Sequence, residues 1–402
     1  MKLAVFLGDL RETDVGGFTF QDEVLRALIE WAPHSRHSLV ACGKASPRLV
    51  ASLAKAGIEY LPFSTFLSNR TRRFLATAFE DLWLLLRACG SRSRFDRELR
   101  RNGIHMVWFV TPFYETTDLP YIYTVWDLQH RIQPWFPEVS ANGRWLFRER
   151  MMRQMIQRAY ATIAPNQAGV DEVRRYYGVS AERVVALAHP TPEFALRPPA
   201  TADAPRICDS HYVFYPAQFV AHKNHVAVLR AIRQLQDLHG RELSVVFVGP
   251  DGGNLAHVRA QAQKLGIADR VHFPGFVSRE RLAQLYREAF ALVYPSFFGP
   301  ENLPPLEAMA LGTPVLASRV DGATEQFGDA ARLFDPLDYD QIANLLDELL
   351  RDPGAREALV RRGLERAAAW TTRDYVVGAM KIVDSFERIR DCWPESSGAS
   401  GR

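Results

Sequence analysis

The stretch FFGPENLPPLEAMALGTPV, from Phe297 to Val315, is the most informative part of the sequence for the fold. It predicts a proline-rich loop that leads from a strand into a helix. It follows the apolar, strand-like run FALVYPS. Asn302 is a suitable N-cap, and prolines are tolerated in the first helical turn, where backbone N–H groups have no partner within the helix. The predicted helix runs from Leu303 to Leu311 and ends at Gly312. The prolines therefore fix the helix start and leave the amides of the preceding loop free to meet an anion.

Glu307 lies about one turn inside this helix. A carboxylate in this position can accept two hydrogen bonds from a ribose diol. The alternative is a capped core helix that carries a surface glutamate, and the residues alone leave both interpretations open.

Composition restricts the class of protein. The 402 residues exceed what one core usually supports, which predicts two domains. The hydrophobic share of 47% and charged share of 24% are those of a soluble globular protein, and a net charge of +3 does not indicate nucleic-acid binding. The four cysteines lack metal or disulfide spacing, and neither an export signal nor a spanning segment is visible. These features predict a cytoplasmic protein.

Short apolar runs alternate with longer helical patterns along the chain. Such continuous apolar strands between helices predict an α/β protein with two doubly wound, Rossmann-like domains and parallel sheets. The predicted strands are 2–7, 38–42, 58–62, 106–110, 121–125, 161–164, 183–187, 212–216, 244–249, 270–273, 290–294, 314–318 and 332–334.

A segment rich in proline and alanine, 196–210, is the predicted linker between the domains. The N-terminal domain is expected over 1–195 and the C-terminal domain over 211–372. A last helix is expected over 373–391, followed by a disordered tail at 393–402. Ligands of such sheets bind outside the carboxyl ends of the strands, so we expect a site in the cleft between the domains.

Three further stretches follow predicted strands. In YPAQFVAHKNH (215–225), Lys223 could hold a phosphate and Gln218 could donate to the same group, although a solvated turn is the alternative. In VGGF (15–18), the two glycines precede a predicted helix and allow close approach of a ligand, or form only a turn. In VWDLQHRIQPWFPE (125–138), Asp127 and His130 could contact an acceptor hydroxyl, or belong to a packed loop.

Two further loops give weaker signals for a binding site. Gly249 lies in a flexible turn, VGPDGGNL, and Phe276 lies in FPGFVSRERL, where it could contact a base.

Taken in order, these stretches resemble the family 4 glycosyltransferases of the GT-B fold. The resemblance covers nearly the whole chain and is strongest over 212–336, where VHFPGFVSRERLAQLYREAFALVYPS, NLPPLEAMALGTPVLAS and DGATEQFGDAARLFDP occur in the family's order. It implies retaining transfer of a sugar from a nucleotide diphosphate sugar without a required metal or cofactor. It also implies that the last helix returns to the first domain.

The resemblance implies roles for individual residues. Glu307 would hold the ribose, and Lys223 would neutralise the departing diphosphate. The expected donor contacts are Gly16, Gly17, Lys223, Gly249, Phe276, Asn302, Leu303 and Glu307, and the expected catalytic groups are Lys223, Asp127, His130, Gln218 and Glu301.

The chain departs from the family pattern at three places. The family's first glutamate falls on Gly299; either Glu301, the nearest acid, replaces it, or loop amides hold the sugar alone. The family's arginine falls on Gln218, and the histidine before the acceptor-side aspartate falls on Trp126, with His130 as a substitute. This variant is similar to a branch found among bacterial polysaccharide and O-antigen transferases, often mannosyltransferases. GDP-mannose is therefore the favoured donor, with a glycan or lipid-linked oligosaccharide as acceptor. A nucleotide-sugar epimerase and a catalytically silent nucleotide-sugar-binding protein remain alternatives.

Two arginine-rich segments, 67–101 and 144–158, interleave basic and apolar residues. They predict peripheral contact of the first domain with an anionic inner membrane face, with Arg70, Arg72 and Arg73 as test positions. The alternative is ordinary surface helices whose arginine stems cover apolar neighbours.

Overall fold

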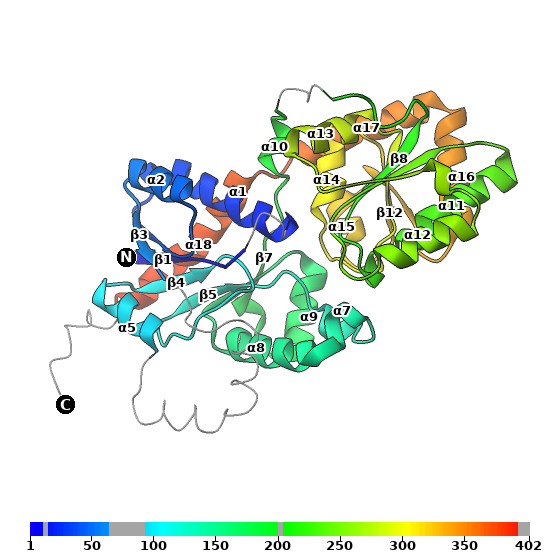
Figure 1. The fold of residues 1–402 in the computed structure, drawn as a ribbon. Helices are drawn as coiled ribbons and strands as arrows, with labels where there is room; N and C mark the ends of the chain where they lie inside the picture. Colours follow the sequence, from blue (N-terminus) through cyan, green and yellow to red (C-terminus); the bar gives the residue numbers. More distant parts are fainter. Residues whose placement is uncertain (11–14, 64–92, 200–203, 393–402) are drawn as a thin grey trace.

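The structure is a computed structural model, and it describes residues 1–10, 15–63, 93–199 and 204–392 (Figure 1). Its core is a pair of parallel β-sheets, one of seven strands and one of six. Every predicted strand is present, with its ends shifted by at most two residues. The fold is GT-B: two Rossmann-like domains, each with helices around a parallel sheet.

The N-terminal sheet has the strand order β3-β2-β1-β4-β5-β6-β7. Its central strands are buried almost throughout because helices cover both faces. The strands are β1 (Lys2–Leu7), β2 (Ser38–Gly43), β3 (Glu59–Pro62), β4 (Met106–Phe109), β5 (Tyr121–Thr124), β6 (Ala161–Ala164) and β7 (Val184–Ala186). The helices are α1 (Val15–Trp31), α2 (Pro47–Lys55), α5 (Arg94–Arg101), α6 (Gln129–Ile132), α7 (Pro137–Ser140), α8 (Arg144–Arg158) and α9 (Gln167–Tyr177).

The C-terminal sheet has the strand order β10-β9-β8-β11-β12-β13. The short helix α10 (Glu193–Leu196) precedes it along the chain. The strands are β8 (Tyr212–Pro216), β9 (Ser244–Val248), β10 (Val271–Gly275), β11 (Ala291–Tyr294), β12 (Val315–Ser318) and β13 (Ala331–Phe334). The helices are α11 (His225–His239), α12 (Leu255–Lys264), α13 (Arg279–Glu288), α14 (Leu303–Ala310), α15 (Ala323–Phe327), α16 (Tyr339–Arg351) and α17 (Pro353–Ala368).

The last helix, α18 (Thr372–Arg390), returns to the N-terminal domain and packs against α1. A capping box between Thr371 and Asp374 fixes its start. Tyr375, Val376 and Val383 are fully buried in the same core as β1 and β4. The chain therefore crosses between the domains twice.

The second arginine-rich segment forms α8, and apolar side chains of this helix are buried inside the protein. Met152, Met155 and Ile156 are buried in the core of the N-terminal domain. Arg153 pairs with Glu149, and Arg158 pairs with Asp118. This packing supports the surface-helix interpretation of α8. Most of the first segment, including the three test arginines, lies outside the described residues. Within the described part of the chain, no helix combines the length and the apolarity needed to cross a membrane.

Candidate active site at the carboxyl edge of the C-terminal sheet

Lys223 lies in a short 3-10 turn, Ala221–Lys223, that follows β8. Its Nζ donates a hydrogen bond of 3.0 Å to the hydroxyl of Tyr294, the last residue of β11. That hydroxyl donates in turn to Oδ1 of Asn302 at 2.9 Å. Because β8 and β11 are neighbours, their carboxyl ends bring the lysine and the helix-start loop together. The structure thus joins two stretches that the sequence predicted separately.

Asn302 occupies the N-cap position of α14, but its side chain does not cap the helix. Its amide donates instead to the carbonyl of Gly299 at 2.9 Å. Gly299 has a φ of +143°, and a Cβ there would stand 2.4 Å from Asn302 Oδ1. A glutamate at position 299 would therefore disrupt this loop, which gives a physical reason for the departure from the family pattern.

Glu301 does not face an open site. Its side chain is 3% exposed, and its carboxylate accepts a hydrogen bond from the backbone N–H of His189 in the N-terminal half of the chain. Burial raises its pKa well above the ordinary value. The expectation that Glu301 replaces the missing glutamate as a sugar contact does not fit this placement, because its carboxylate already accepts a hydrogen bond from the other domain.

Glu307 is also largely enclosed, at 8% exposure, on α14. The hydroxyl of Tyr286 donates to its Oε2 at 2.6 Å. Burial raises the pKa of Glu307 to about 7, although the hydrogen bond from Tyr286 and the charge of Arg279 oppose that rise. Leu303, at the start of the same helix, is buried.

The remaining donor candidates differ in exposure. Gln218 and Phe276 are exposed, the latter at 63%. Gly249 has a φ of +151°, and a Cβ there would stand 2.3 Å from the carbonyl oxygen of Ala217. Close backbone packing therefore already requires glycine at position 249.

The glycine pair lies inside the first turn of α1, not in a loop before the helix as predicted. Gly16 is exposed, and nothing stands within 4 Å of a Cβ built there. A Cβ on Gly17 would stand only 2.8 Å from the ring of Trp126. The residue that replaces the family's histidine therefore packs directly on Gly17.

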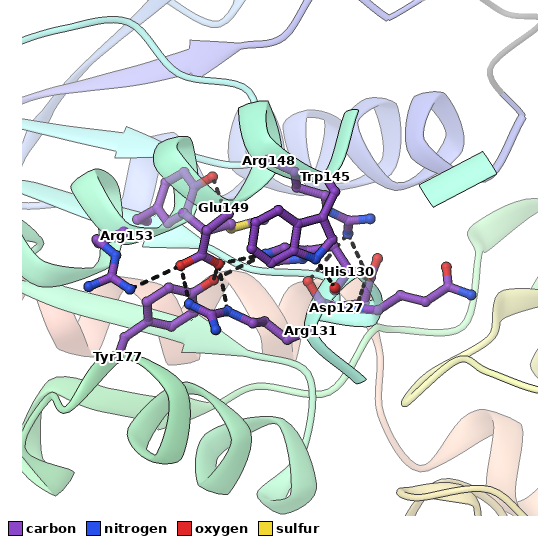
Figure 2. A network of polar contacts seen from close by, with 11 residues as sticks. Asp127, His130, Arg131, Trp145, Arg148, Glu149, Arg153 and Tyr177 are labelled. Atoms are coloured by element: carbon purple, nitrogen blue, oxygen red, sulfur yellow. Dashed lines mark hydrogen bonds and ion pairs between the residues drawn. The ribbon is translucent and has the colours of Figure 1, made fainter. Parts of the chain in front are cut away.

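Asp127 follows β5 and remains 28% exposed (Figure 2). Its carboxylate accepts from the backbone N–H of Gln129 at 2.9 Å and forms an ion pair with Arg148. Burial opposes its ionisation, but the charge of Arg148 and these hydrogen bonds lower its pKa. Asp127 is thus an ionised hydrogen-bond acceptor at the carboxyl edge of the N-terminal sheet.

His130 lies in a buried network and has no exposed surface (Figure 2). Its Nε2 is 3.2 Å from both Glu149 Oε2 and the hydroxyl of Tyr177. Glu149 also accepts hydrogen bonds from Arg131 and Arg153. Burial lowers the pKa of His130 to about 4. The expectation that His130 contacts an acceptor does not agree with the structure, because its neutral ring is enclosed by α8 and α9.

A cavity of about 510 Å³ opens in the N-terminal domain. It lies beyond the carboxyl ends of β1, β2 and β3. Its polar lining includes Gln21, Tyr60 and the ion pair between Lys44 and Asp9, 2.6 Å apart.

Sequence reasoning missed the tyrosines that hold the site together. Tyr294 connects Lys223 to Asn302, and Tyr286 contacts Glu307. The position of Tyr294 at the carboxyl end of a predicted strand was a usable signal. Tyr286 lies on the buried face of α13, where its partner cannot be read from the sequence.

In a comparison with known protein families, residues 203–366 match the family described as "Glycosyl transferases group 1". These residues are therefore similar to a group 1 glycosyltransferase domain. The matched region contains Lys223, Tyr294, Asn302 and Glu307, the residues that the geometry brings to one sheet edge.

Relatives and solved structures extend this result. O-antigen chain mannosyltransferase B of Escherichia coli is 28% identical over 58% of this chain and 62% of its own length. D-inositol 3-phosphate glycosyltransferase 2 of Catenulispora acidiphila is 34% identical over 55% of this chain and 57% of its own length. This chain thus matches less than two thirds of either relative. The crystal structure of WaaG, a glycosyltransferase involved in lipopolysaccharide biosynthesis, superposes with a TM-score of 0.66 over 95% of this chain and 99% of its own, at 16% identity.

Proposed function

We propose that the protein is a retaining glycosyltransferase that moves a hexose from a nucleoside diphosphate sugar to a glycan or lipid-linked acceptor. The observation that carries the proposal is the chain of hydrogen bonds from Lys223 through Tyr294 to Asn302, within the region that matches the group 1 family. It fixes a cation beside the start of the helix that carries Glu307.

The chemistry of the donor explains this arrangement. Glycosyl transfer breaks the bond between the anomeric carbon and the diphosphate, which leaves positive charge on the sugar and negative charge on the leaving group. A fixed lysine and oriented amides stabilise the developing negative charge. Lys223 takes this role in the proposal, and the ionised form of Glu307 accepts hydrogen bonds from the ribose diol.

On the acceptor side, Asp127 supplies an ionised carboxylate that can accept a hydrogen bond from the attacking hydroxyl. His130 takes no part, because its ring is enclosed. The cavity lined by Lys44 and Tyr60 is the proposed acceptor subsite, since it opens at the carboxyl edge of the other sheet. An acceptor with hydroxyl groups suits this mixed polar and apolar lining.

GDP-mannose is the favoured donor, and bacterial surface polysaccharide synthesis is the favoured process. The O-antigen chain mannosyltransferase among the relatives supports mannose as the sugar and a surface polysaccharide as the product, whereas the D-inositol 3-phosphate glycosyltransferase is named for a different acceptor. We place the enzyme on the cytoplasmic side of the membrane, where a lipid-linked acceptor would be available.

Product analysis tests the proposal. The protein is incubated with GDP-mannose, UDP-glucose or UDP-galactose, each with and without a mixture of oligosaccharide acceptors, and products are followed by NMR. Acceptor-dependent transfer with the donor's anomeric configuration supports a retaining transferase. Conversion of the donor sugar without acceptor would indicate an epimerase. Nucleotide binding without any product would indicate a silent binding protein.

A further inference from the structure

A short segment of the N-terminal domain, 133–138, reaches the donor-side loops. Gln133 Nε2 donates to the carbonyl of Phe297 at 2.9 Å. The ring of Phe136 stacks on that of Phe297, with centroids 5.9 Å apart and an interplanar angle of 26°. The segment therefore contacts the C-terminal domain through both polar and aromatic groups.

The central contact joins Glu138 to His222. Oε1 of Glu138 accepts from the backbone N–H of His222 at 2.8 Å and contacts the ring Nδ1 at 2.5 Å. Both side chains are 14% exposed. Burial opposes ionisation of Glu138, but the hydrogen bonds from the ring and backbone of His222 outweigh it and lower the pKa of Glu138 to about 2. An ionised carboxylate thus requires the tautomer of His222 that carries its proton on Nδ1.

His222 is the residue directly before Lys223, in the same 3-10 turn. Its carbonyl accepts from the backbone N–H of Phe297 at 2.9 Å. The carbonyl of Lys223 accepts from the hydroxyl of Tyr215 at 2.7 Å. Glu138 therefore holds, from the other domain, a turn whose backbone also accepts hydrogen bonds from Phe297 and Tyr215 of the C-terminal domain.

We propose that Glu138 is a positioning residue: through His222 it fixes the Lys223 turn and holds the two domains against each other. The proposal rests on the proposed function for its kinetic consequence, because Lys223 is there assigned to the diphosphate. Its structural consequence, an interdomain contact, stands independently of activity.

The location of the contact favours this role. Figure 1 shows α7, which carries Glu138, in the lower part of the view beneath the C-terminal domain, whereas α10, which follows one of the two crossings between domains, lies in the upper part. A contact far from the crossings resists separation of the domains more effectively than one beside them. The hydrogen bonds to His222 combine charge with two donors, which makes them stronger than a neutral pair.

Kinetics provide the first arm of the test. We compare wild type, Glu138→Gln, Glu138→Ala, His222→Ala and the double alanine variant, measuring kcat and the KM for the donor. Glu59→Ala is the matched control, because Glu59 pairs with Lys2 within the N-terminal domain.

We expect Glu138→Ala to lower kcat/KM by about 10- to 100-fold, since small displacements of a reacting group have effects of this size. Glu138→Gln should lose less, because its amide oxygen still accepts from His222. The double variant should be no worse than the worse single variant, because both changes remove one shared contact.

Small-angle scattering provides the second arm and does not need turnover. Glu138→Ala should increase the radius of gyration of the unliganded protein, while its circular dichroism stays that of wild type. Unchanged scattering together with wild-type kcat/KM would overturn the proposal. If wild type transfers no sugar from any donor, the proposed function fails, and the scattering result alone decides the role of Glu138.

Discussion

Lys223 and Tyr294 are joined by a hydrogen bond of 3.0 Å across the carboxyl ends of two neighbouring strands. The ammonium group also lies 5.3 Å from the centroid of the tyrosine ring. The tyrosine thus limits the freedom of a flexible side chain, so that less conformational entropy is lost when Lys223 meets a diphosphate.

The first prediction concerns this pair. Lys223→Ala should lower kcat by about 10²- to 10³-fold, the range found when a group that stabilises developing negative charge is removed. Tyr294→Phe should have a smaller effect, because the cation remains. Steady-state kinetics with the preferred donor measure both, and a wild-type kcat for Lys223→Ala would contradict the assigned role.

The second prediction concerns Gly17 and Trp126. Gly17→Ala should destabilise the protein by about 1–3 kcal/mol, because the new methyl group would overlap the indole ring. Gly16→Ala is the matched control: it has open space and should be neutral or stabilising by up to about 1 kcal/mol. Thermal unfolding of both variants checks this. Equal effects would show that the ring does not constrain position 17.

The KM of Gly16→Ala for the donor gives separate information. If the backbone of α1 meets the diphosphate closely, this variant should bind donor more weakly while its stability is preserved. An unchanged KM would remove Gly16 from the donor site.

The third prediction concerns Glu307 and pH. Its pKa is about 7 in the folded protein against an ordinary value of 4.5, so between these pH values the folded state binds more protons than the unfolded state. Stability should therefore fall as pH rises through this window, by on the order of 1–3 kcal/mol in total. Glu307→Gln should remove this loss, so that its melting temperature exceeds that of wild type at pH 8 but not at pH 4.5. A difference that does not change with pH would contradict the assignment.

The fourth prediction concerns metal ions. Among the described residues, one group, His37, Asp384 and Glu387, places possible ligand atoms within 4.8 Å of one another. It comes from the residue before β2 and from α18, not from the donor-side loops, and Arg36 already pairs with both acids. Transfer should therefore persist in EDTA. Loss of activity that Mg²⁺ or Mn²⁺ restores would show that Lys223 is not sufficient at the diphosphate.

The strands and the donor edge were predictable because they depend on local signals. Continuous apolar runs gave each strand, and the position of Lys223 and Asn302 after strands β8 and β11 gave their common edge. The sequence shows that glycine stands at position 299 in place of the family's glutamate. It does not show that the side chain of Asn302 leaves no room for a Cβ there.

His130 and Glu138 show where sequence reasoning ended. The environment of His130 depends on Glu149 and Tyr177, which are 19 and 47 residues away along the chain. Glu138 meets His222 over a separation of 84 residues. Whether a polar residue faces a ligand or a buried partner is set by such distant contacts, which have no periodicity in the sequence.

The most direct test of the donor site is nucleotide binding measured by calorimetry. Wild type is first titrated with GDP, UDP and ADP to find the preferred base. The preferred diphosphate is then compared with its monophosphate and its 2′,3′-dideoxy form in wild type, Lys223→Ala and Glu307→Ala. We predict that Lys223→Ala loses the preference for diphosphate over monophosphate, and that Glu307→Ala loses the preference for ribose over dideoxyribose. Wild-type preferences in both variants would contradict the placement of the donor at this sheet edge.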